Sequence, residues 1–313
     1  MESKKYLILA FYHFTPIENP HEEVAKQHAF FENRDVTSRI YIAHEGINGQ
    51  MSASVEDAEA YMQWLKQDPR FQNIDFKCDP YHEHILPRKT IKFREQLVAL
   101  DLKPDLTQRG TPVPPKEWKE MLETRDEDTV LIDVRNDYEW KVGHFEGADL
   151  PDLEMFREFP LYAEKLKKNL DTEKTKVMMY CTGGIRCEFY SALLKKAGFK
   201  NVFQLQGGVI NYGHQEGGAH WRGKLFVFDD RLAIPLTEEG ESEVISCCHH
   251  CEIPSDTYYN CANMDCNALF VCCLTCAEKY GGCCSEDCTK ADRVRPYEKR
   301  EKPKPFRKWY HYS

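Results

Sequence analysis

Apolar residues recur along residues 1–102 with two spacings, one typical of strands and one typical of helices. Strands are expected at Tyr6–Phe14, Val36–Ala43, a short run after the turn Glu45–Gly49, Asp75–Cys78 and Lys89–Val98. Helices are expected at Pro20–Asn33 and Ser54–Gln67. The resulting β-α-β-β-α-β order predicts a ferredoxin-like α+β domain over residues 1–102.

The last of these strands places cationic side chains on one face. Because side chains alternate along a strand, Arg88, Thr90, Lys92 and Arg94 fall on the same face. Such a ridge is either a solvated sheet surface or a track for phosphate groups. Arg88, Lys92 and Arg94 are therefore candidates for RNA binding.

Residues 103–115 interrupt the pattern with four prolines and few large apolar residues, which is typical of a linker. From residue 116 to residue 235 short apolar strands alternate with helices. The strands are expected at Thr129–Val134, Lys176–Tyr180 and Asn201–Leu205, and the helices at Lys116–Glu123, within Leu150–Leu170 and at Cys187–Ala197. This alternation predicts an α/β domain whose parallel sheet is covered by helices on both faces.

Cysteine distribution separates a third module, residues 236–290. Eleven of the fourteen cysteines lie between Cys247 and Cys288, and an odd number cannot all pair as disulfides. Short spacings typical of zinc sites suggest two structural zinc ions. The expected ligands are Cys248, Cys251, Cys261, Cys266, Cys273, Cys276, Cys284 and Cys288. Adjacent cysteines at 247, 272 and 283 leave single ligands open, and His249 or His250 could substitute.

Composition and charge indicate the cellular compartment and the kinds of partner to expect. No apolar run approaches the roughly 20 residues of a membrane helix, and no export signal is seen, so a cytoplasmic protein without a membrane partner is expected. The formal net charge is −9, yet Thr289–Ser313 contains nine Lys or Arg and three acidic residues. Residues 291–313 form a basic tail with interleaved aromatic residues, which is either a disordered end or a contact for unpaired RNA bases. Its candidate RNA contacts are Arg293, Arg295, Arg300 and Lys304.

The chemistry is expected in the loop Cys181-Thr182-Gly183-Gly184-Ile185-Arg186, which follows an apolar strand and precedes a helix. Ligands of open α/β folds bind at this carboxyl edge of the sheet. Two glycines let successive N–H groups point inward as an anion-binding nest, which lowers a thiol pKa and can hold a persulfide anion. A buried structural cysteine is the alternative for Cys181, and Cys187 is either structural or a resolving thiol.

Residues 115–225 resemble a rhodanese domain. The landmarks are this loop, Asp133-Val134-Arg135 with Tyr138-Glu139, Gly143-His144 with Gly147-Ala148, and Leu205-Gln206-Gly207-Gly208-Val209. Six residues from Cys181 to Arg186 suit a sulfur atom, whereas the related phosphatases use a longer loop. The resemblance makes Cys181 and Arg186 the catalytic candidates, with Asp133 and Arg135 in support.

The whole order of domains, with Gly46-Ile47-Asn48-Gly49 at the start and Asn260-Cys261 through Cys283-Cys284-Ser285 near the end, resembles the bacterial tRNA uridine hydroxylase family. That resemblance implies oxygen-dependent conversion of the wobble uridine of tRNA to 5-hydroxyuridine. It implies an essential Cys181 that passes through a persulfide, and a sulfur donor protein as a possible partner. No flavin or nicotinamide fingerprint appears in the sequence.

Two other functions fit parts of the sequence. A rhodanese-type sulfurtransferase acting on thiosulfate or persulfide donors needs the same cysteine but neither the first domain nor the tail. A zinc-dependent RNA-binding adaptor with an inactive rhodanese fold needs the outer modules but not Cys181.

Overall fold

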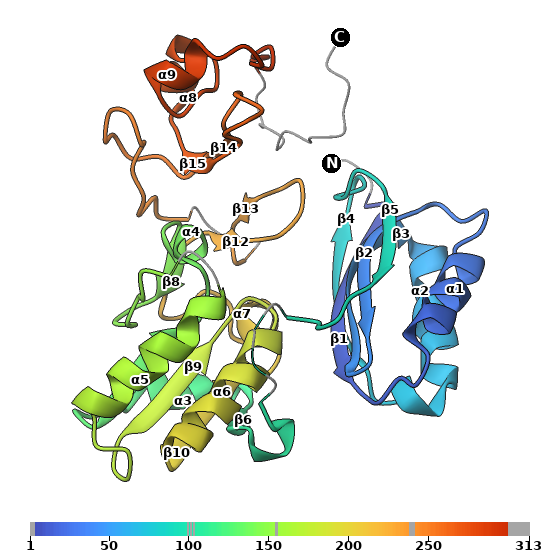
Figure 1. Cartoon of the computed structure of the whole chain (residues 1–313), viewed down its shortest axis with the longest axis vertical. Helices are drawn as coiled ribbons and strands as arrows, with labels where there is room; N and C mark the ends of the chain where they lie inside the picture. Colours follow the sequence, from blue (N-terminus) through green and yellow to red (C-terminus); the bar gives the residue numbers. More distant parts are fainter. Residues whose placement is uncertain are drawn as a thin grey trace. The chain divides into compact units, whose positions relative to one another are not determined.

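The computed structural model describes residues 4–98, 100, 102, 104–153, 156–237 and 242–299 (Figure 1). The chain forms two compact units, Met1–Lys103 and Pro104–Ser313. Within the described residues, no helix combines the length and the apolar composition that crossing a membrane requires.

The first unit is built on one five-stranded sheet. Its strands are β1 (Tyr6–Phe14), β2 (Val36–Ala43), β3 (Gly46–Ser54), β4 (Asp75–Tyr81) and β5 (Lys89–Phe93), in the spatial order β4-β1-β3-β2-β5. The helices α1 (Pro20–Phe30) and α2 (Val55–Gln67) cover one face of the sheet (Figure 1). The first four strands and the two helices give the predicted ferredoxin-like order.

The last strand differs from its predicted extent. It ends at Phe93, not at Val98, and it is a fifth strand that runs parallel to β2 at the sheet edge. The N–H of Arg94 still donates to the Ile42 carbonyl (2.8 Å), but the N–H of Leu97 donates to the Glu45 carboxylate (2.7 Å). A side-chain acceptor therefore replaces the neighbouring strand, which an alternation pattern cannot indicate.

The local sequence of α2 determines where this helix begins and which of its faces is buried. The Ser54 hydroxyl accepts a hydrogen bond from the Asp57 N–H (3.1 Å) and so caps the helix start. Ala58, Tyr61 and Leu65 lie at helical spacing, and all three are buried in the core between the helices and the sheet. The capping residue fixes where the helix begins, and the apolar stripe fixes which face is buried.

The second unit begins with the predicted parallel sheet, which has four strands where three were expected. Its strands are β6 (Thr111–Val113), β7 (Thr129–Asp133), β9 (Lys176–Tyr180) and β10 (Asn201–Leu205), in the order β6-β10-β9-β7. The helices are α3 (Pro115–Glu123), α4 (Asp137–Trp140), α5 (Phe159–Asn169), α6 (Ile185–Ala197) and α7 (Gly208–Glu216). Helix α3 packs with α7, and α5 packs with α6, which lies in front of the sheet in Figure 1.

Two predicted segments of this unit differ from the structure. The expected linker, residues 103–115, contains a 3-10 turn at Leu106–Gln108 and the edge strand β6, which pairs with β10. In the segment predicted as helical, Leu150–Leu170, α5 begins only at Phe159, after a 3-10 turn at Phe156–Glu158. The short elements α4 and β8 (Gly143–Phe145) were not predicted, because three or four residues are too few to show a period.

The remainder of the second unit has little regular structure. It contains β11 (Trp221–Gly223), which pairs with β8, the hairpin β12 (Leu225–Phe226) and β13 (Ala233–Ile234), the hairpin β14 (Tyr258–Asn260) and β15 (Leu269–Val271), and the helices α8 (Leu274–Lys279) and α9 (Glu286–Thr289). Cysteines make up much of the small core around β14, β15 and α8. Such a core is too small to fold by apolar burial alone, so another source of stability is required.

Candidate functional site

The nucleophile loop lies between β9 and α6. Cys181 follows the last residue of β9, and Gly184 precedes the first residue of α6. Gly184 has a φ of 101°, a left-handed conformation that glycine adopts without strain. Its N–H donates to the Cys181 sulfur across 3.1 Å. The loop therefore directs a main-chain donor at the sulfur, as an anion-binding nest requires.

The ionisation of Cys181 is controlled by these surroundings. Burial alone raises the pKa of the Cys181 thiol, but a hydrogen bond from the Cys187 thiol and the charge of Arg186 oppose it. Together with the N–H groups of Cys187 and Gly184, they lower the pKa of Cys181 to about 6. Burial and the neighbouring Cys181 raise the pKa of Cys187 well above its usual range. At neutral pH, Cys181 is thus a thiolate and Cys187 a thiol that donates to it.

Arg186 acts on Cys181 through its charge while its guanidinium binds Glu139. Arg186 Nη2 donates to Glu139 Oε1 (2.7 Å), and Nη1 donates to Oε2. The Thr182 hydroxyl donates to the same Oε1 (2.9 Å). All three side chains are buried. The sequence marks Glu139 only as a rhodanese landmark, and no local pattern indicates that it is the partner of Arg186.

Glu139 is held in place by the short helix that carries it. The N–H of Asn136 donates to Glu139 Oε2 (3.2 Å), which completes a capping box at the start of α4. The carboxylate therefore links the first turn of α4 to Arg186 and Thr182. A residue that caps its own helix and pairs with the nucleophile loop connects the two segments rigidly.

The N-terminus of α7 supports the loop from the other side. The N–H of Val209 donates to the Cys181 carbonyl (3.0 Å), and the N–H of Ile210 donates to the Thr182 carbonyl (3.1 Å). A Cβ on Gly208 would lie 2.6 Å from the Cys181 and Thr182 carbonyl oxygens and from the Gly184 nitrogen. Gly208 also has a φ of +71°. The loop can therefore rest on α7 only with glycine at this position.

Asp133 and Arg135 form a buried ion pair at the carboxyl end of β7. Arg135 Nη2 lies 2.6 Å from Asp133 Oδ2 and 2.5 Å from the Gly143 carbonyl oxygen. The guanidinium also lies 5.1 Å from the centre of the Trp221 ring. These contacts fix the turn between β7 and α4, so we propose a supporting role for the pair.

Access to the sulfur is restricted. Cys181 has no exposed surface, and Thr182 is 7% exposed. Gly183, by contrast, is half-buried, and a Cβ on it would meet no atom within 4 Å. Open space therefore lies beside the loop at Gly183.

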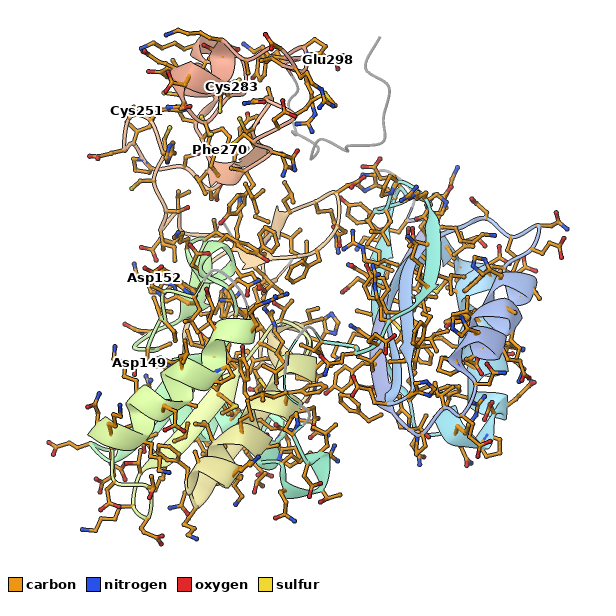
Figure 2. All side chains as sticks on the ribbon, in the orientation of Figure 1. Asp149, Asp152, Cys251, Phe270, Cys283 and Glu298 are labelled. Carbon is orange, nitrogen blue, oxygen red and sulfur yellow. The ribbon has the colours of Figure 1, made fainter. Side chains whose placement is uncertain are left out.

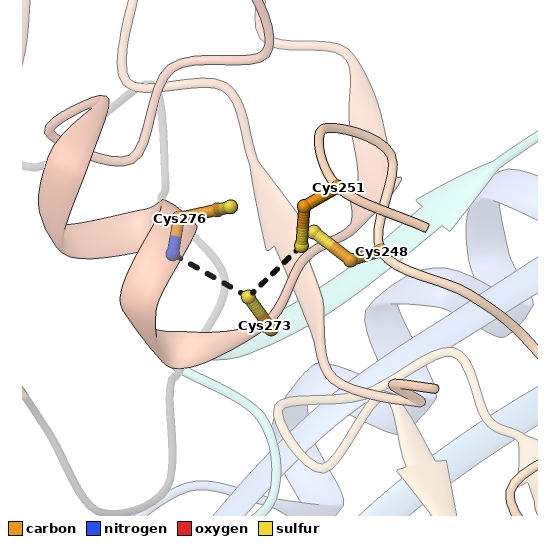
Figure 3. Close-up of side chains that lie close together, drawn as sticks. All are labelled: Cys248, Cys251, Cys273 and Cys276. Carbon is orange, nitrogen blue, oxygen red and sulfur yellow. Dashed lines mark hydrogen bonds between the residues drawn. The ribbon is translucent and has the colours of Figure 1, made fainter. Parts of the chain in front are cut away.

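Four cysteine sulfurs meet at each of two points in the cysteine-rich part of the chain. The first cluster is Cys248, Cys251, Cys273 and Cys276, drawn in Figure 3, and the second is Cys261, Cys266, Cys284 and Cys288. Within each cluster all four sulfurs lie within 4.8 Å of one another. These are the eight residues that spacing indicated. Cysteine pairs that belong to the two clusters alternate along the chain. The first cysteine pair joins the third, and the second joins the fourth, which the sequence did not reveal.

The distances between sulfurs identify the kind of site. Cys251 and Cys273 are 3.7 Å apart, and Cys284 and Cys288 are 3.8 Å apart. A disulfide would bring two sulfurs to about 2.0 Å. Four thiolates at about 2.3 Å from one zinc ion lie about 3.8 Å from each other. The four-sulfur sets therefore fit structural zinc, with no position left for a substrate.

The neighbouring cysteines and histidines lie outside both clusters. Cys247 is exposed, whereas Cys272 and Cys283 are buried in the core of the module. The ring of His250 lies 3.0 Å from the Cys283 carbonyl oxygen and stacks on Tyr280. Figure 2 shows where Cys251, Phe270 and Cys283 lie in this module. Each adjacent pair thus contributes one sulfur to a cluster and one residue to the core or the surface.

The candidate RNA contacts differ in their surroundings. Arg88, Lys92 and Arg94 are exposed; Lys92 lies in β5, whereas Arg88 and Arg94 lie just outside its two ends. The Arg94 guanidinium lies 4.9 Å from the centre of the Tyr41 ring. Arg293 is also exposed and pairs with Asp265 (2.9 Å).

Arg295, a candidate RNA contact, is buried and not exposed. Its guanidinium donates to the Cys261 carbonyl (2.7 Å) and to the Asn267 side chain (2.8 Å). It therefore connects segments of the cysteine-rich region. Arg300 and Lys304 lie outside the described residues.

Three family models match consecutive segments of the chain. A UPF0176 acylphosphatase like domain matches residues 6–97, a rhodanese-like domain matches residues 114–214, and a Rhodanase C-terminal domain matches residues 222–289. The solution structure of a rhodanese-like domain from Anabaena covers 39% of this chain and 80% of its own, at 22% identity and a TM-score of 0.29.

Similarity to curated proteins extends over the whole length. The tRNA uridine(34) hydroxylase of Protochlamydia amoebophila is 56% identical over 99% of this chain and 97% of its own. The protein of the same name from Chlamydia felis is 54% identical over 98% of this chain and 94% of its own. With all three segments matched in one continuous alignment, the chain belongs to the tRNA uridine(34) hydroxylase family.

Proposed function

We propose that this protein hydroxylates uridine 34 of tRNA to 5-hydroxyuridine, with molecular oxygen as cosubstrate and with Cys181 as the essential residue. The observation that carries the proposal is the 56% identity over 99% of the chain to a protein of that name. A shared rhodanese domain alone would indicate only sulfur chemistry. Identity across the first domain and the cysteine-rich module as well indicates a shared reaction and a shared tRNA substrate.

Cys181 supplies the sulfur chemistry of the site. Its thiolate attacks the outer sulfur of a donor persulfide, the sulfur–sulfur bond of the donor breaks, and the donor leaves as a thiol. The product is a persulfide on Cys181, whose negative charge the loop amides and the charge of Arg186 stabilise. The open space beside Gly183 is the route by which a sulfur donor, including a donor protein, reaches the loop.

Zinc holds the cysteine-rich module together. The ligands proposed are the eight cysteines of the two clusters, each set closed by four sulfurs. When bound, the two ions supply folding free energy to a module with short strands and helices. Besides the zinc ligands, exposed residues of this part of the chain are proposed to contribute to tRNA binding, among them Arg293 just beyond the module.

RNA recognition is proposed for the exposed cations of β5. Lys92 lies in this edge strand and Arg94 directly follows its last residue, and both exposed side chains can follow a phosphate backbone. We also propose that the reaction takes place in the cytoplasm, because the proposed substrate is tRNA.

Nucleoside analysis tests the function directly. A strain without its own copy of the gene receives the wild-type gene, Cys181→Ala or the matched control Cys78→Ala, and tRNA digests are examined by mass spectrometry. Wild type and Cys78→Ala are expected to restore 5-hydroxyuridine, whereas Cys181→Ala is expected to give none. Undiminished 5-hydroxyuridine with Cys181→Ala would falsify the proposed role of the cysteine.

A plain sulfurtransferase is the second candidate, because the buried thiolate of Cys181 is sufficient for that reaction. Thiosulfate would transfer its outer sulfur to Cys181 and leave as sulfite, and cyanide would then accept the sulfur as thiocyanate. Rapid thiocyanate formation by the full chain, together with unchanged 5-hydroxyuridine in the gene deletion, would favour this candidate over the hydroxylase.

A further inference from the structure

A series of contacts joins the cysteine-rich module to the nucleophile loop. Tyr258, on β14, is 3% exposed, and its hydroxyl donates to the backbone carbonyl of Tyr138 in α4. The rings of Tyr138 and Tyr258 both pack edge-on against Phe226, with ring centroids 5.2 and 5.3 Å away. An ion pair between Lys224 and Asp256 (2.7 Å) gives a second link. The module therefore contacts the backbone of the helix that carries Glu139.

Helix α4 needs such anchors because it has only four residues, too few for a helix to be stable alone. On one side the Trp140 indole N–H donates to the Pro151 carbonyl (3.0 Å), and the Asp137 N–H donates to the Leu153 carbonyl (3.0 Å). On the other side the anchors are the Tyr258 hydroxyl and the packing of the Tyr138 ring on Phe226. Loss of the hydroxyl removes the one hydrogen bond among these two anchors, and α4 is then expected to shift away from the module.

A shift of α4 is transmitted to Cys181 through two buried side chains. Glu139 follows Tyr138 directly in α4 and holds the Arg186 guanidinium by two hydrogen bonds. When Glu139 moves, Arg186 loses its buried counter-charge. A buried unpaired charge is costly, so the guanidinium turns toward solvent and away from the sulfur.

We propose that Tyr258 is a positioning residue for Cys181: through its hydroxyl the zinc-binding module holds α4 and so keeps Arg186 beside the nucleophile loop. The module thereby controls the ionisation of Cys181, separately from any contact that it makes with RNA. The proposal rests on the assigned role of Cys181 and does not depend on which substrate the protein modifies.

The ionisation of Cys181 can be measured at one peptide. Trypsin cleavage after Lys176 and Arg186 gives the peptide Val177–Arg186, in which Cys181 is the only cysteine. The full-length protein receives a short pulse of iodoacetamide at several pH values between 5 and 9. Mass spectrometry of this peptide then gives the rate of Cys181 alkylation and its pH midpoint, unaffected by the zinc ligands.

The variants are Tyr258→Phe and the matched control Tyr259→Phe. Both lose one buried tyrosine hydroxyl of β14, but that of Tyr259 bonds to Tyr297 within the module. Tyr258→Phe is expected to raise the midpoint by about one unit, which lowers alkylation at pH 6 about five-fold. Tyr259→Phe is expected to keep the wild-type midpoint. Zinc content, measured for each variant, is expected to remain at the wild-type value.

Removal of zinc from the wild-type protein with a chelator is expected to raise the same midpoint, because α4 then loses its anchor. The proposal is overturned when Tyr258→Phe keeps the wild-type midpoint, when Tyr259→Phe shifts it equally, or when zinc removal leaves it unchanged. Any of these results leaves the nucleoside assay untouched. An absence of 5-hydroxyuridine with wild-type protein, in turn, would reject the hydroxylase without affecting the titration.

Discussion

Glu139 and Arg186 form a buried bidentate ion pair next to the nucleophile loop. The pair joins the first turn of α6 to α4, two segments separated by more than forty positions of sequence. Its arginine is part of the loop motif, but its glutamate is not. The electrostatic environment of Cys181 is thus set jointly by the loop and by a helix outside it.

Replacing Glu139 by Gln should cost stability. A buried arginine without its counter-charge destabilises a protein by about 3–5 kcal/mol, whereas loss of an exposed pair costs about 1 kcal/mol or less. Glu173, exposed and 3.9 Å from Lys200, provides the control variant Glu173→Gln. Urea denaturation at pH 7 should show a large loss for Glu139→Gln and a small one for Glu173→Gln. Equal losses would mean that the buried pair contributes no more to the free energy of unfolding than the exposed pair does.

The cost of that substitution should depend on pH. Burial raises the pKa of Glu139, but the charge and hydrogen bonds of Arg186 outweigh it and hold the pKa below its ordinary value. A lowered folded-state pKa contributes stability above the unfolded pKa of about 4.3, and this contribution is lost as pH falls through the folded value. The difference in unfolding free energy between wild type and Glu139→Gln should therefore shrink in acid. A constant difference from pH 7 down to pH 3 would contradict this assignment.

Arg186→Gln should make Cys181 less acidic. Without the guanidinium charge, the pKa of Cys181 is expected to rise from about 6 toward the ordinary cysteine value of about 8.5. Arg186→Lys keeps a charge but not the bidentate geometry and should fall between the two. Alkylation of Cys181 gives the midpoint of each variant. Chymotrypsin replaces trypsin because Arg186 is a cleavage site, and fragment ions of the peptide Cys181–Phe189 distinguish Cys181 from Cys187. A midpoint near 6 in Arg186→Gln would show that the Cys187 thiol and the backbone amides ionise Cys181 without the guanidinium.

Sequence reasoning located the nucleophile loop because strand, cysteine and paired glycines are adjacent in the chain. It also found the eight cysteines of the two clusters, since their spacing is local. It could not find Glu139 as the partner of Arg186 or assign cysteine pairs to clusters. Both depend on contacts between distant segments, which a single sequence does not encode as a period or a motif.

The burial of Arg295 could not be predicted, for a related reason. A basic residue among other basic residues is typical of a solvated or RNA-binding surface, and nothing local distinguishes one that is buried. Its partner, the Cys261 carbonyl, belongs to a zinc-cluster residue more than thirty positions earlier. For β5 only the predicted end was wrong, because the N–H of Leu97 donates to the Glu45 carboxylate and not to the neighbouring strand.

Two glycines near Cys181 should respond differently to alanine. At Gly208 a Cβ would clash with the loop backbone at 2.6 Å, and the φ of +71° is unfavourable for alanine. At Gly183 a Cβ would meet nothing within 4 Å. Gly208→Ala is expected to lower the melting temperature and abolish 5-hydroxyuridine, whereas Gly183→Ala should retain the wild-type melting temperature. Normal stability and activity in Gly208→Ala would show that α7 does not support the loop closely.

Metal content should reveal the alternating arrangement of the clusters. Cys251 and Cys276 share one cluster, whereas Cys266 belongs to the other. The double variant Cys251→Ser/Cys276→Ser should lose one of two zinc ions, and Cys251→Ser/Cys266→Ser should lose both. Cys247→Ser, at an exposed cysteine outside both clusters, should keep two. Elemental analysis of the purified proteins decides the matter, and loss of both ions from the first double variant would reject the assignment.

Substitution of Arg94 should weaken tRNA binding, whereas substitution of Arg295 should lower stability. Arg94 is exposed directly after the end of β5, so Arg94→Gln should weaken tRNA binding and reduce the slope of log affinity against log salt by about 0.7–0.9 for one phosphate contact. Arg295→Gln breaks buried hydrogen bonds to Cys261 and Asn267 and should lower stability instead, with the salt slope unchanged. Binding measured from 50 to 300 mM salt, alongside thermal melting, separates the two effects. An unchanged slope in Arg94→Gln would remove β5 from the RNA surface, and a reduced slope in a stably folded Arg295→Gln would restore that residue to it.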